Sequence, residues 1–449
     1  MTTTATKTDS YTQLDLSAEQ QDMINRVAVL ARENFAPRAG EYDRTAAFPA
    51  EDFDDLFRAG LLAPVVPKEH GGYGLGPYAG EVFTLWMMTK EIARADMSLA
   101  RCWEGHVNSL VLLDGMATED QKSRWFKGVV ERGEKWVAWS GEPQARKPGE
   151  QARFGTTVEK VDGGYRIDGN KAFATSAGGA QWAILLVNTA GPGGVRHVDA
   201  ASGDSVLMMA CNLSDPSVEI DTSWWDPIGM RGTASHLVHF RKTFIPDDDL
   251  IGYPGQNLKE GWQTCFIPHY AATFLGAAEA AFDYALSYIK SQNKIDEPYV
   301  QHHIGQMSVN VETAHLWLKQ VAHLWETGRY LEAQIAGSRA RHVVEHLAAD
   351  AAVEVHPVRP QPVPAPLRVV VAGAGLALPE TPGAPLMKKV SPAFPAEATT
   401  MTPARTALSL ANAEGFEATP KFEPSDMLIT SRRSSKSPSL LGSIDHSMA

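Results

Sequence analysis

The sequence predicts an α+β protein built in blocks, and three observations carry this prediction. Apolar residues recur at helical spacing in the first 135 residues and again after residue 257. Between these blocks, short apolar runs alternate with Gly, Asn, Asp and Pro. The final stretch is rich in Pro, Ala and Ser. We therefore expect an N-terminal helical domain, a middle β domain, a C-terminal helical bundle and a tail, at residues 1–135, 136–256, 257–350 and 351–449.

The first block begins with a clear helix signal. Ser17 precedes a stretch of helical periodicity, Gln20 follows three residues later, and Pro37 closes the stretch. Ser at the N-cap with Gln at the third helical position is a capping box. We expect an opening amphipathic helix over residues 17–36, a second helix over residues 51–59, a glycine-punctuated loop over residues 67–76, and long helices from there to residue 125.

The middle block has the sequence pattern of β-strands. The runs TTVEKV, GYRI, WAILLV, SVLMMACNL and HLVHF are separated by turn residues between residues 135 and 252. Helical periodicity returns after residue 257, with Ala-rich segments over residues 271–290 and 305–350. This order favours separate helical and β layers over an alternating parallel sheet.

The tail differs from the rest of the chain. It holds 14 of the 28 prolines and none of the 11 tryptophans or 11 tyrosines. Such a segment buries too little apolar surface to offset its ordering entropy, so we expect disorder. Two explanations stay open: a natural flexible extension, or a frameshift that interrupts the bundle and leaves it incomplete.

Composition limits the partners and the compartment. The net charge is −12 and no Lys/Arg-rich block stands out, which argues against nucleic acid as a partner. The three cysteines are far apart and lack metal-ligand spacing, so we expect neither disulfides nor a metal site. No apolar stretch is long enough to span a membrane, and no signal peptide is visible. A cytoplasmic protein is expected.

Four stretches, in order, resemble the acyl-CoA dehydrogenase superfamily. They are FRAGLLAPVVPKEHGGYGLG (57–76), TEDQKSRWFKGVVERGEKWVAWSGEP (118–143), GYRIDGNKAFATSAGGAQWAILLV (164–187) and DPIGMRGTASHLVHFRKTFIPDDDLIG (226–252). The last, with its Gly-Met-Arg-Gly-Thr order, is the most specific. The resemblance implies a barrel-like middle domain that binds a flavin, FAD or alternatively FMN.

The resemblance also implies which residues contact the flavin. An aromatic side chain against the ring and a hydroxyl near its reactive nitrogen are what such a site needs. The expected cofactor contacts, with Thr175 also expected to take part in catalysis, are Trp139, Ser140, Gly141, Phe173, Ala174, Thr175 and Ser176. The family's usual Thr-Glu-Pro becomes Gly-Glu-Pro here and its usual loop becomes Gln-Ala-Arg-Lys-Pro, so backbone groups at residues 139–141 would carry part of the contact.

The bundle lacks the base that a dehydrogenase needs. An acyl-CoA dehydrogenase removes an α-proton with a desolvated Glu, but the early bundle position here is His269 and the later position falls in the tail. The run ATFLGAAEAAFDYAL is more similar to the branch that uses reduced flavin and oxygen, such as dibenzothiophene monooxygenase and the amino-sugar nitrososynthases. Those enzymes need a dry pocket and no such base.

The resemblance therefore favours a flavin monooxygenase, with a nucleotide-linked amino sugar of secondary metabolism as a suggested substrate. His106 is the candidate proton-handling residue, although a packed helix-face histidine is the alternative. Arg231 could equally be a structural ion-pair residue. The expected pocket residues are Trp103, Glu104, Asn108, Arg231, Thr233 and His269.

Two other functions stay open. An acyl-CoA dehydrogenase would have to take its base from Glu312 or another bundle carboxylate, and a damaged, non-catalytic protein would bind flavin poorly. The family implies a homotetramer, and the monooxygenase branch implies a flavin reductase as partner.

Overall fold

The computed structural model describes residues 16–143, 154–189 and 206–358. The opening helix α1 (Ala18–Leu30) starts as expected: Gln20 N–H donates to Ser17 Oγ at 3.2 Å, and Ser17 N–H donates to Gln20 Oε1 at 2.8 Å. The expected end near Pro37 is wrong. A π-helical turn (Ala31–Phe35) leads directly into α2 (Ala36–Thr45), with the proline in the first turn of α2. The wider turn redirects the backbone before the proline, whose ring would clash in a regular helix.

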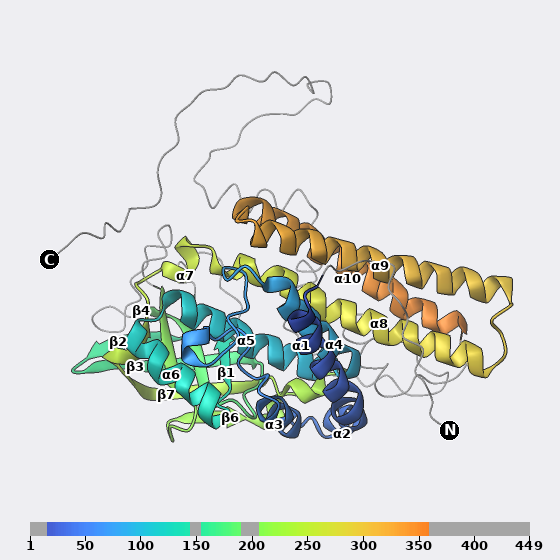
Figure 1. Ribbon diagram of the computed structural model, residues 1–449. Helices are drawn as coiled ribbons and strands as arrows, with labels where there is room; N and C mark the ends of the chain where they lie inside the picture. The colour runs from blue at the N-terminus through green and yellow to red at the C-terminus, as the bar shows by residue number, and fades with distance from the viewer. Residues whose placement is uncertain (1–15, 144–153, 190–205, 359–449) are drawn as a thin grey trace, which may run out of the picture. The chain divides into compact units, whose positions relative to one another are not determined.

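Two of the four remaining N-terminal helices form the most deeply buried layer. Nearly every residue of the fourth and fifth helices is buried, so both lack a polar face and pack on several sides. Figure 1 shows them between the sheet and the C-terminal helices. The four remaining N-terminal helices are α3 (Ala50–Arg58), α4 (Val82–Ala95), α5 (Met97–Met116) and α6 (Glu119–Arg132).

The middle block is a single sheet, as its alternating texture predicts. In the described residues its order is β6-β7-β3-β2-β4-β5-β8, with β1 beside β4, and no described pairing joins its two ends. The sheet is therefore open in the described residues, so the expected barrel is not closed, and the sheet has an apolar core of its own. Its strands are β1 (Trp136–Trp139), β2 (Thr157–Val161), β3 (Gly164–Ala174), β4 (Trp182–Thr189), β5 (Val206–Asn212), β6 (Val218–Asp221), β7 (His236–Pro246) and β8 (Leu250–Ile251).

Both faces of β4 and β5 are buried, which explains why these strands are apolar throughout. Ile184 and Leu186 pack into the core shared with the helices. Leu185 and Val187, on the opposite face, pack into a second core enclosed by the sheet. Successive side chains of a strand point to opposite faces, so a strand between two cores needs an uninterrupted apolar run.

Three long helices complete the described fold: α8 (Ile267–Ser291), α9 (Pro298–Glu326) and α10 (Tyr330–Val358). Helix α10 continues beyond Asp350, so the expectation that the disordered tail begins at residue 351 is wrong for residues 351–358. The apolar period of EHLAADAA carries the helix onward. The rest of the tail, from residue 359, lies outside the described residues. Despite their length, the described helices include none that is apolar enough to cross a membrane.

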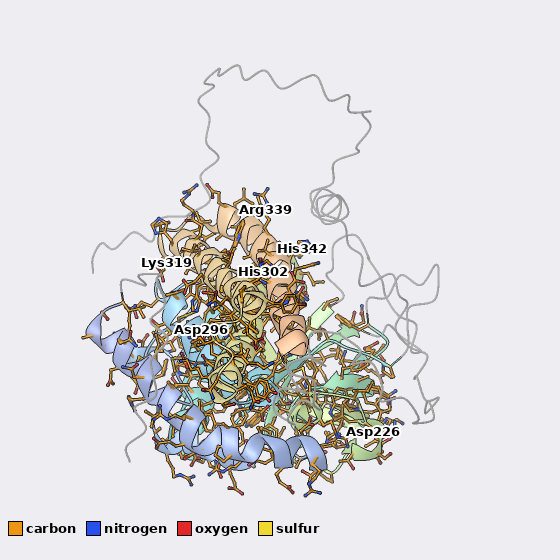
Figure 2. The ribbon with its side chains drawn as sticks, turned by 90° about the vertical axis from the view of Figure 1, so that its right-hand side faces the viewer. Asp226, Asp296, His302, Lys319, Arg339 and His342 are labelled. Carbon is orange, nitrogen blue, oxygen red and sulfur yellow. The ribbon has the colours of Figure 1, made fainter. Side chains whose placement is uncertain are left out.

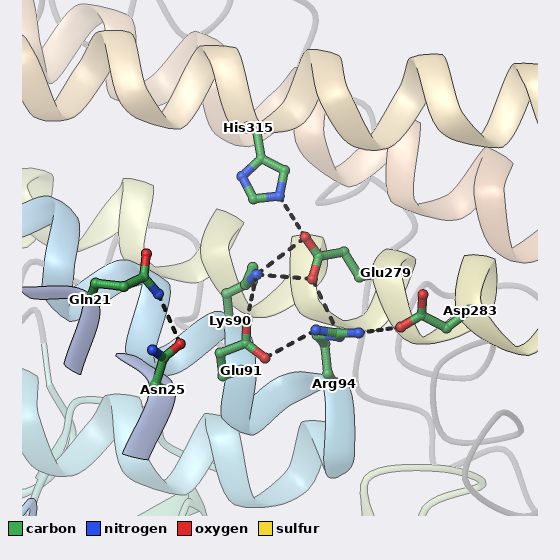
Figure 3. Close-up of polar contacts among 8 residues, drawn as sticks. All are labelled: Gln21, Asn25, Lys90, Glu91, Arg94, Glu279, Asp283 and His315. Atoms are coloured by element: carbon green, nitrogen blue, oxygen red, sulfur yellow. Dashed lines mark hydrogen bonds and ion pairs between the residues drawn. The ribbon is translucent and has the colours of Figure 1, made fainter. Parts of the chain in front are cut away.

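A buried ion-pair cluster joins α4 to α8 and α9 (Figure 3). A carboxylate oxygen of Glu279 on α8 lies 3.0 Å from Lys90 Nζ and 3.4 Å from Arg94 Nε, both on α4. His315 Nε2 of α9 lies 2.5 Å from the same carboxylate. Arg94 also pairs with Asp283. The N-terminal helices and the C-terminal helices therefore share charged as well as apolar contacts.

Candidate functional site

The backbone is strained where β3 ends and β7 begins. Phe173 and Ser176 have φ angles of 52° and 65°, and Met230 and Ala234 across from them have φ angles of 56° and 43°. Non-glycine residues seldom adopt these left-handed conformations, and a bulky aromatic residue does so least readily. Such strain persists only where surrounding contacts hold it, and it clusters at functional sites.

The Phe173 ring is displayed instead of packed into the core. The β3–β7 register shifts between Lys171 and Ala174, and this bulge turns the side chain outward. The residue is 43% exposed, and its ring meets Trp224 edge-on with centroids 4.8 Å apart. The ring of Trp225 lies 6.2 Å away. The result is an exposed aromatic surface beside the strained turn.

The end of β1 lies next to this turn, as the expected cofactor contacts require. Trp139 Nε1 donates to the Thr175 carbonyl at 3.0 Å. Ala172 N–H donates to the Gly141 carbonyl at 3.0 Å. A Cβ on Gly141 would lie 2.6 Å from the Ala172 oxygen, so only glycine fits. Ser140 and Gly141 are exposed. The structure thus gathers residues 139–141 and 173–176 at one place.

A buried lysine that the sequence analysis missed holds the neighbouring loop. Lys171 Nζ donates to Glu142 Oε1 at 2.9 Å and to the Leu186 carbonyl at 2.7 Å. Glu142 Oε1 also accepts from Thr156 N–H at 2.9 Å. Burial opposes ionisation of Glu142, but the Lys171 charge and the backbone donors outweigh it and lower the pKa of that carboxyl. A lysine at a core-facing strand position was the signal available in the sequence. The divergent loop that follows Pro143 lies outside the described residues.

Three hydroxyls form a chain behind the strained turn. Thr233 Oγ1 donates to the Met230 carbonyl at 2.9 Å and lies 2.8 Å from Ser235 Oγ. Ser235 Oγ donates to Thr175 Oγ1 at 3.1 Å. Thr233 and Ser235 are buried, whereas Thr175 is half-buried. Ser235 was not predicted, because nothing in the sequence shows that β7 brings it opposite Thr175.

The Arg231 side chain binds its own loop and the end of helix α2. Its guanidinium donates to the Asp43 and Pro227 carbonyls at 2.9 and 3.1 Å and pairs with Asp226 at 2.5 Å. Asp226 lies at the exposed edge of the sheet region (Figure 2). These contacts support the structural alternative and give the predicted site-rim role no support.

Four of the predicted pocket residues form one buried hydrogen-bond chain. Trp103 Nε1 donates to Thr89 Oγ1 at 3.1 Å, and that hydroxyl lies 2.7 Å from His269 Nε2. His269 Nδ1 lies 2.8 Å from Asn108 Oδ1 and donates to it, because a carbonyl oxygen can only accept. Asn108 Nδ2 donates to Glu104 Oε1 at 3.2 Å. Helices α4, α5 and α8 therefore meet through this chain.

Burial controls the charges in this chain. Desolvation raises the pKa of Glu104 to about 7, although Arg101 Nη1 lies 3.1 Å from its second oxygen. Desolvation, with the Arg101 charge, lowers the pKa of His269 to about 3, so the imidazole is neutral. The Arg101 guanidinium lies 4.9 Å from the centre of the Tyr270 ring.

His106 is placed differently from the prediction. Trp136 N–H donates to its Nδ1 at 3.0 Å, and its Nε2 lies 3.0 Å from the Leu62 carbonyl, to which it donates. The residue is fully buried, and desolvation lowers its pKa to about 4. Both ring nitrogens are engaged by the backbone, so the contacts support the helix-packing alternative and not proton handling.

Helix α5 connects the hydrogen-bond chain to the strained turn. Cys102 Sγ contacts the Thr233 carbonyl at 3.6 Å, and Ser176 N–H donates to the same oxygen at 2.9 Å. Trp103 follows Cys102 directly. Two adjacent residues of α5 therefore contact the two groups of predicted residues. Cys102 contacts Thr233, and Trp103 belongs to the buried hydrogen-bond chain.

Comparison with known proteins finds two family models that match parts of this chain. Residues 17–133 match the acyl-CoA dehydrogenase N-terminal domain and residues 268–357 match the acyl-CoA dehydrogenase C-terminal domain. The chain therefore contains an acyl-CoA dehydrogenase N-terminal domain and an acyl-CoA dehydrogenase C-terminal domain, with the sheet between them.

Its relatives carry out two kinds of oxidation. Mitochondrial isovaleryl-CoA dehydrogenase of Solanum tuberosum is 25% identical over 331 residues, covering 71% of this chain and 76% of the relative. Dibenzothiophene monooxygenase of Rhodococcus qingshengii is 25% identical over 349 residues, covering 72% and 79%. The structure of TdsC from Paenibacillus sp. A11-2 with FMN and indole has the same fold, with a TM-score of 0.66, 22% identity and coverage of 75% and 87%.

Proposed function

We propose that this protein is a flavin-dependent monooxygenase that uses reduced flavin and oxygen. The observation that carries the proposal is the strained turn over residues 173–176, which displays an aromatic ring and a hydroxyl together. Strain of this kind is costly and is kept where a site requires it.

The residues present fit an isoalloxazine ring. Phe173 offers a partly exposed aromatic face, Thr175 offers a hydroxyl, and Ser140 and Gly141 offer exposed backbone beside them. Buried His236 on β7 lies opposite Ala174 on β3. Its Nδ1 has no hydrogen-bond partner in the described chain. When bound, the flavin supplies electron transfer and oxygen activation. The protein residues position it and exclude water from it.

The described contacts favour oxygenation over dehydrogenation. Proton abstraction needs a carboxylate that can reach the substrate. His269, at the early bundle position, has both nitrogens engaged. Glu104 has a suitably raised pKa, but one oxygen accepts from Asn108 and the other faces Arg101. Glu312 lies on α9, which packs against other helices.

Relatives support this choice but do not name the substrate. Dibenzothiophene monooxygenase of Rhodococcus qingshengii is a relative in sequence, and TdsC, which was solved with FMN, shares the fold. FAD stays the first expectation from the sequence resemblance, and the FMN in TdsC keeps FMN as the alternative. The amino-sugar substrate, the reductase partner and the tetramer stay predictions from sequence resemblance.

Acyl-CoA dehydrogenation is the second candidate, because Glu104 is a desolvated carboxylate whose pKa is raised to about 7. In this case Glu104 would have to leave Asn108 or Arg101 to reach a thioester substrate. The isovaleryl-CoA dehydrogenase relative makes isovaleryl-CoA a suitable probe.

One pair of assays separates the two candidates. The full-length protein is first titrated with FAD and with FMN, and binding is followed by the flavin absorbance. Oxygen uptake is then measured with a flavin reductase, NADH and either dibenzothiophene or indole. In parallel, the flavin-loaded protein is mixed with isovaleryl-CoA without oxygen.

We expect tight flavin binding, substrate-dependent oxygen uptake and no anaerobic bleaching. Bleaching by isovaleryl-CoA would replace the proposal with dehydrogenation. Protein that binds neither flavin would overturn both candidates and favour a non-catalytic role. Phe173→Ala is the matched variant, and it should weaken flavin binding while the fold stays intact.

A further inference from the structure

The hydroxyl chain formed by Thr175, Ser235 and Thr233 makes three contacts. The donor directions supply a hydrogen to only two of them. The contacts as they stand direct the Thr233 proton to the Met230 carbonyl and the Ser235 proton to Thr175. That leaves the Thr233–Ser235 contact, at 2.8 Å, without a hydrogen. This distance is typical of an O–H···O hydrogen bond, so Thr233 or Ser235 must direct its proton along this contact instead.

Two concerted arrangements satisfy the chain. In the inward arrangement Thr175 donates to Ser235, Ser235 donates to Thr233, and Thr233 donates to the Met230 carbonyl. All three contacts then hold a hydrogen, and Thr175 presents a lone pair outward. In the outward arrangement Thr233 donates to Ser235 and Ser235 donates to Thr175, whose own proton points outward. The Met230 carbonyl then keeps only the backbone donor, Thr233 N–H at 3.2 Å.

The two arrangements suit different oxidation states of a flavin. The reactive ring nitrogen of oxidised flavin accepts a hydrogen bond, whereas in reduced flavin it carries a hydrogen and donates. With Thr175 beside this nitrogen, as the sequence resemblance implies, the inward arrangement would suit the reduced ring and the outward arrangement would suit the oxidised ring. Because the inward arrangement alone fills every contact, the buried chain favours the reduced form.

Resting on the proposed function, we propose that Ser235 is a positioning residue that, with Thr233, makes the site bind reduced flavin more tightly than oxidised flavin. Ser235 acts through Thr175. The device suits an enzyme that receives reduced flavin from another protein and must keep it while oxygen reacts. No bond to the flavin is made or broken, since only hydroxyl protons rotate.

The test is the ratio of two dissociation constants, that of oxidised FAD divided by that of chemically reduced FAD. Both are measured on the full-length protein without oxygen, by flavin absorbance and tryptophan fluorescence. Ser235→Ala cuts the chain, so the Thr175 proton loses its inward acceptor when reduced flavin binds. Thr233→Val leaves the Ser235 proton without an acceptor in the same state. Each variant should lower the ratio about fivefold, as the loss of one hydrogen bond implies.

The two substitutions should not add, because each interrupts the same chain. The double variant is expected to match the single variants, and Ser235→Thr, which keeps the hydroxyl, should restore the ratio. Thr243→Val is the control. It removes a buried hydroxyl from β7, the strand that follows Ser235, where it contacts Ser217 instead, and should leave the ratio unchanged.

The outcomes distinguish this inference from the function on which it rests. An unchanged ratio in Ser235→Ala and Thr233→Val, with normal flavin binding, overturns the inference alone, as does a double variant whose losses multiply. Wild-type protein that binds neither form of FAD overturns the proposed function and the inference with it. Should Ser235→Ala fail to fold, Thr233→Val and Ser235→Thr decide.

Discussion

Glu104 shows how burial sets the charge state of a single residue. Its carboxyl is fully buried on α5, and desolvation raises its pKa from 4.5 to about 7. The folded protein therefore holds this proton more tightly than the unfolded chain does. The stability that neutral Glu104 contributes is fully present below about pH 4.5 and is lost as the pH rises to about 7.

We predict that Glu104→Gln removes this pH dependence. Between pH 5 and pH 8, the free energy of unfolding of the wild type should fall relative to that of the variant by on the order of 2–3 kcal/mol. Urea denaturation at both pH values measures the difference. His269 and His106, whose pKa values are lowered, act in the opposite direction in both proteins and cancel in the comparison. A constant difference would contradict the raised pKa.

Phe173 allows stability and binding to be separated. Its left-handed backbone costs about 1 kcal/mol that glycine does not incur. We predict that Phe173→Gly is more stable than Phe173→Ala by roughly that amount in thermal unfolding. Both variants lose the exposed ring and should bind flavin weakly. Equal stability of the two variants would mean that the backbone relaxes when the ring is removed.

At this scale the sequence predicted several residues that the structure brings together, but not the contacts that they make. Trp103, Asn108 and His269 were expected in one pocket and do lie in one hydrogen-bond chain. Ser235 and Lys171 were missed, because their roles depend on the β3–β7 register and on which face of β3 is buried. A local pattern cannot show which partner a side chain meets across a sheet.

At the scale of elements, the cluster in Figure 3 joins helices that are far apart in the sequence. Burial opposes ionisation of Glu279, yet the charge of Lys90 and the hydrogen bond from His315 lower the pKa of its carboxyl. The carboxylate therefore stays charged at neutral pH, and α4, α8 and α9 are held to one alignment.

Glu279→Gln should weaken the contact between α4, α8 and α9 and lower the free energy of unfolding. Removing one partner of a buried ion pair leaves uncompensated charge and typically costs about 3–5 kcal/mol. Glu41→Gln is the control, since the Glu41–Arg44 pair is exposed and screened by water, so its loss should change stability far less. Guanidinium unfolding of both variants tests this. Similar small losses would show that the cluster contributes alignment but little stability.

Secondary structure was predictable where its cause is local. The capping box at Ser17 and the alternating texture of the sheet depend on neighbouring residues, and both were confirmed. The end of the first helix was mispredicted because Pro37 is accommodated by a π turn. The end of α10 was mispredicted because the change in composition begins inside the helix.

At the scale of the whole described fold, two buried cores share β4 and β5. One core gathers apolar side chains from helices on both sides in the sequence, and the other lies within the sheet. Neither core can open without exposing one face of these two strands. Figure 1 shows the sheet and the helices that cover it.

We therefore predict a single cooperative unfolding transition for the described fold. Far-UV circular dichroism and tryptophan fluorescence should report the same midpoint in guanidinium, as two-state behaviour requires. Two separate midpoints would show that the sheet core and the helical core unfold independently. Leu185→Ala and Leu186→Ala, which face different cores, should each lower the common midpoint.

The sequence by itself determined the order of the helical and strand blocks and the resemblance to acyl-CoA dehydrogenases, and it predicted a site around Phe173 and Thr175. These follow from periodicity, composition and motif order, which are properties of neighbouring residues. The tertiary structure alone decided that His106 and Arg231 are held by backbone and loop contacts, and that Ser235 stands behind Thr175. Hydrogen-bond partners are set by which segments fold against each other, and that information is distributed over the whole chain.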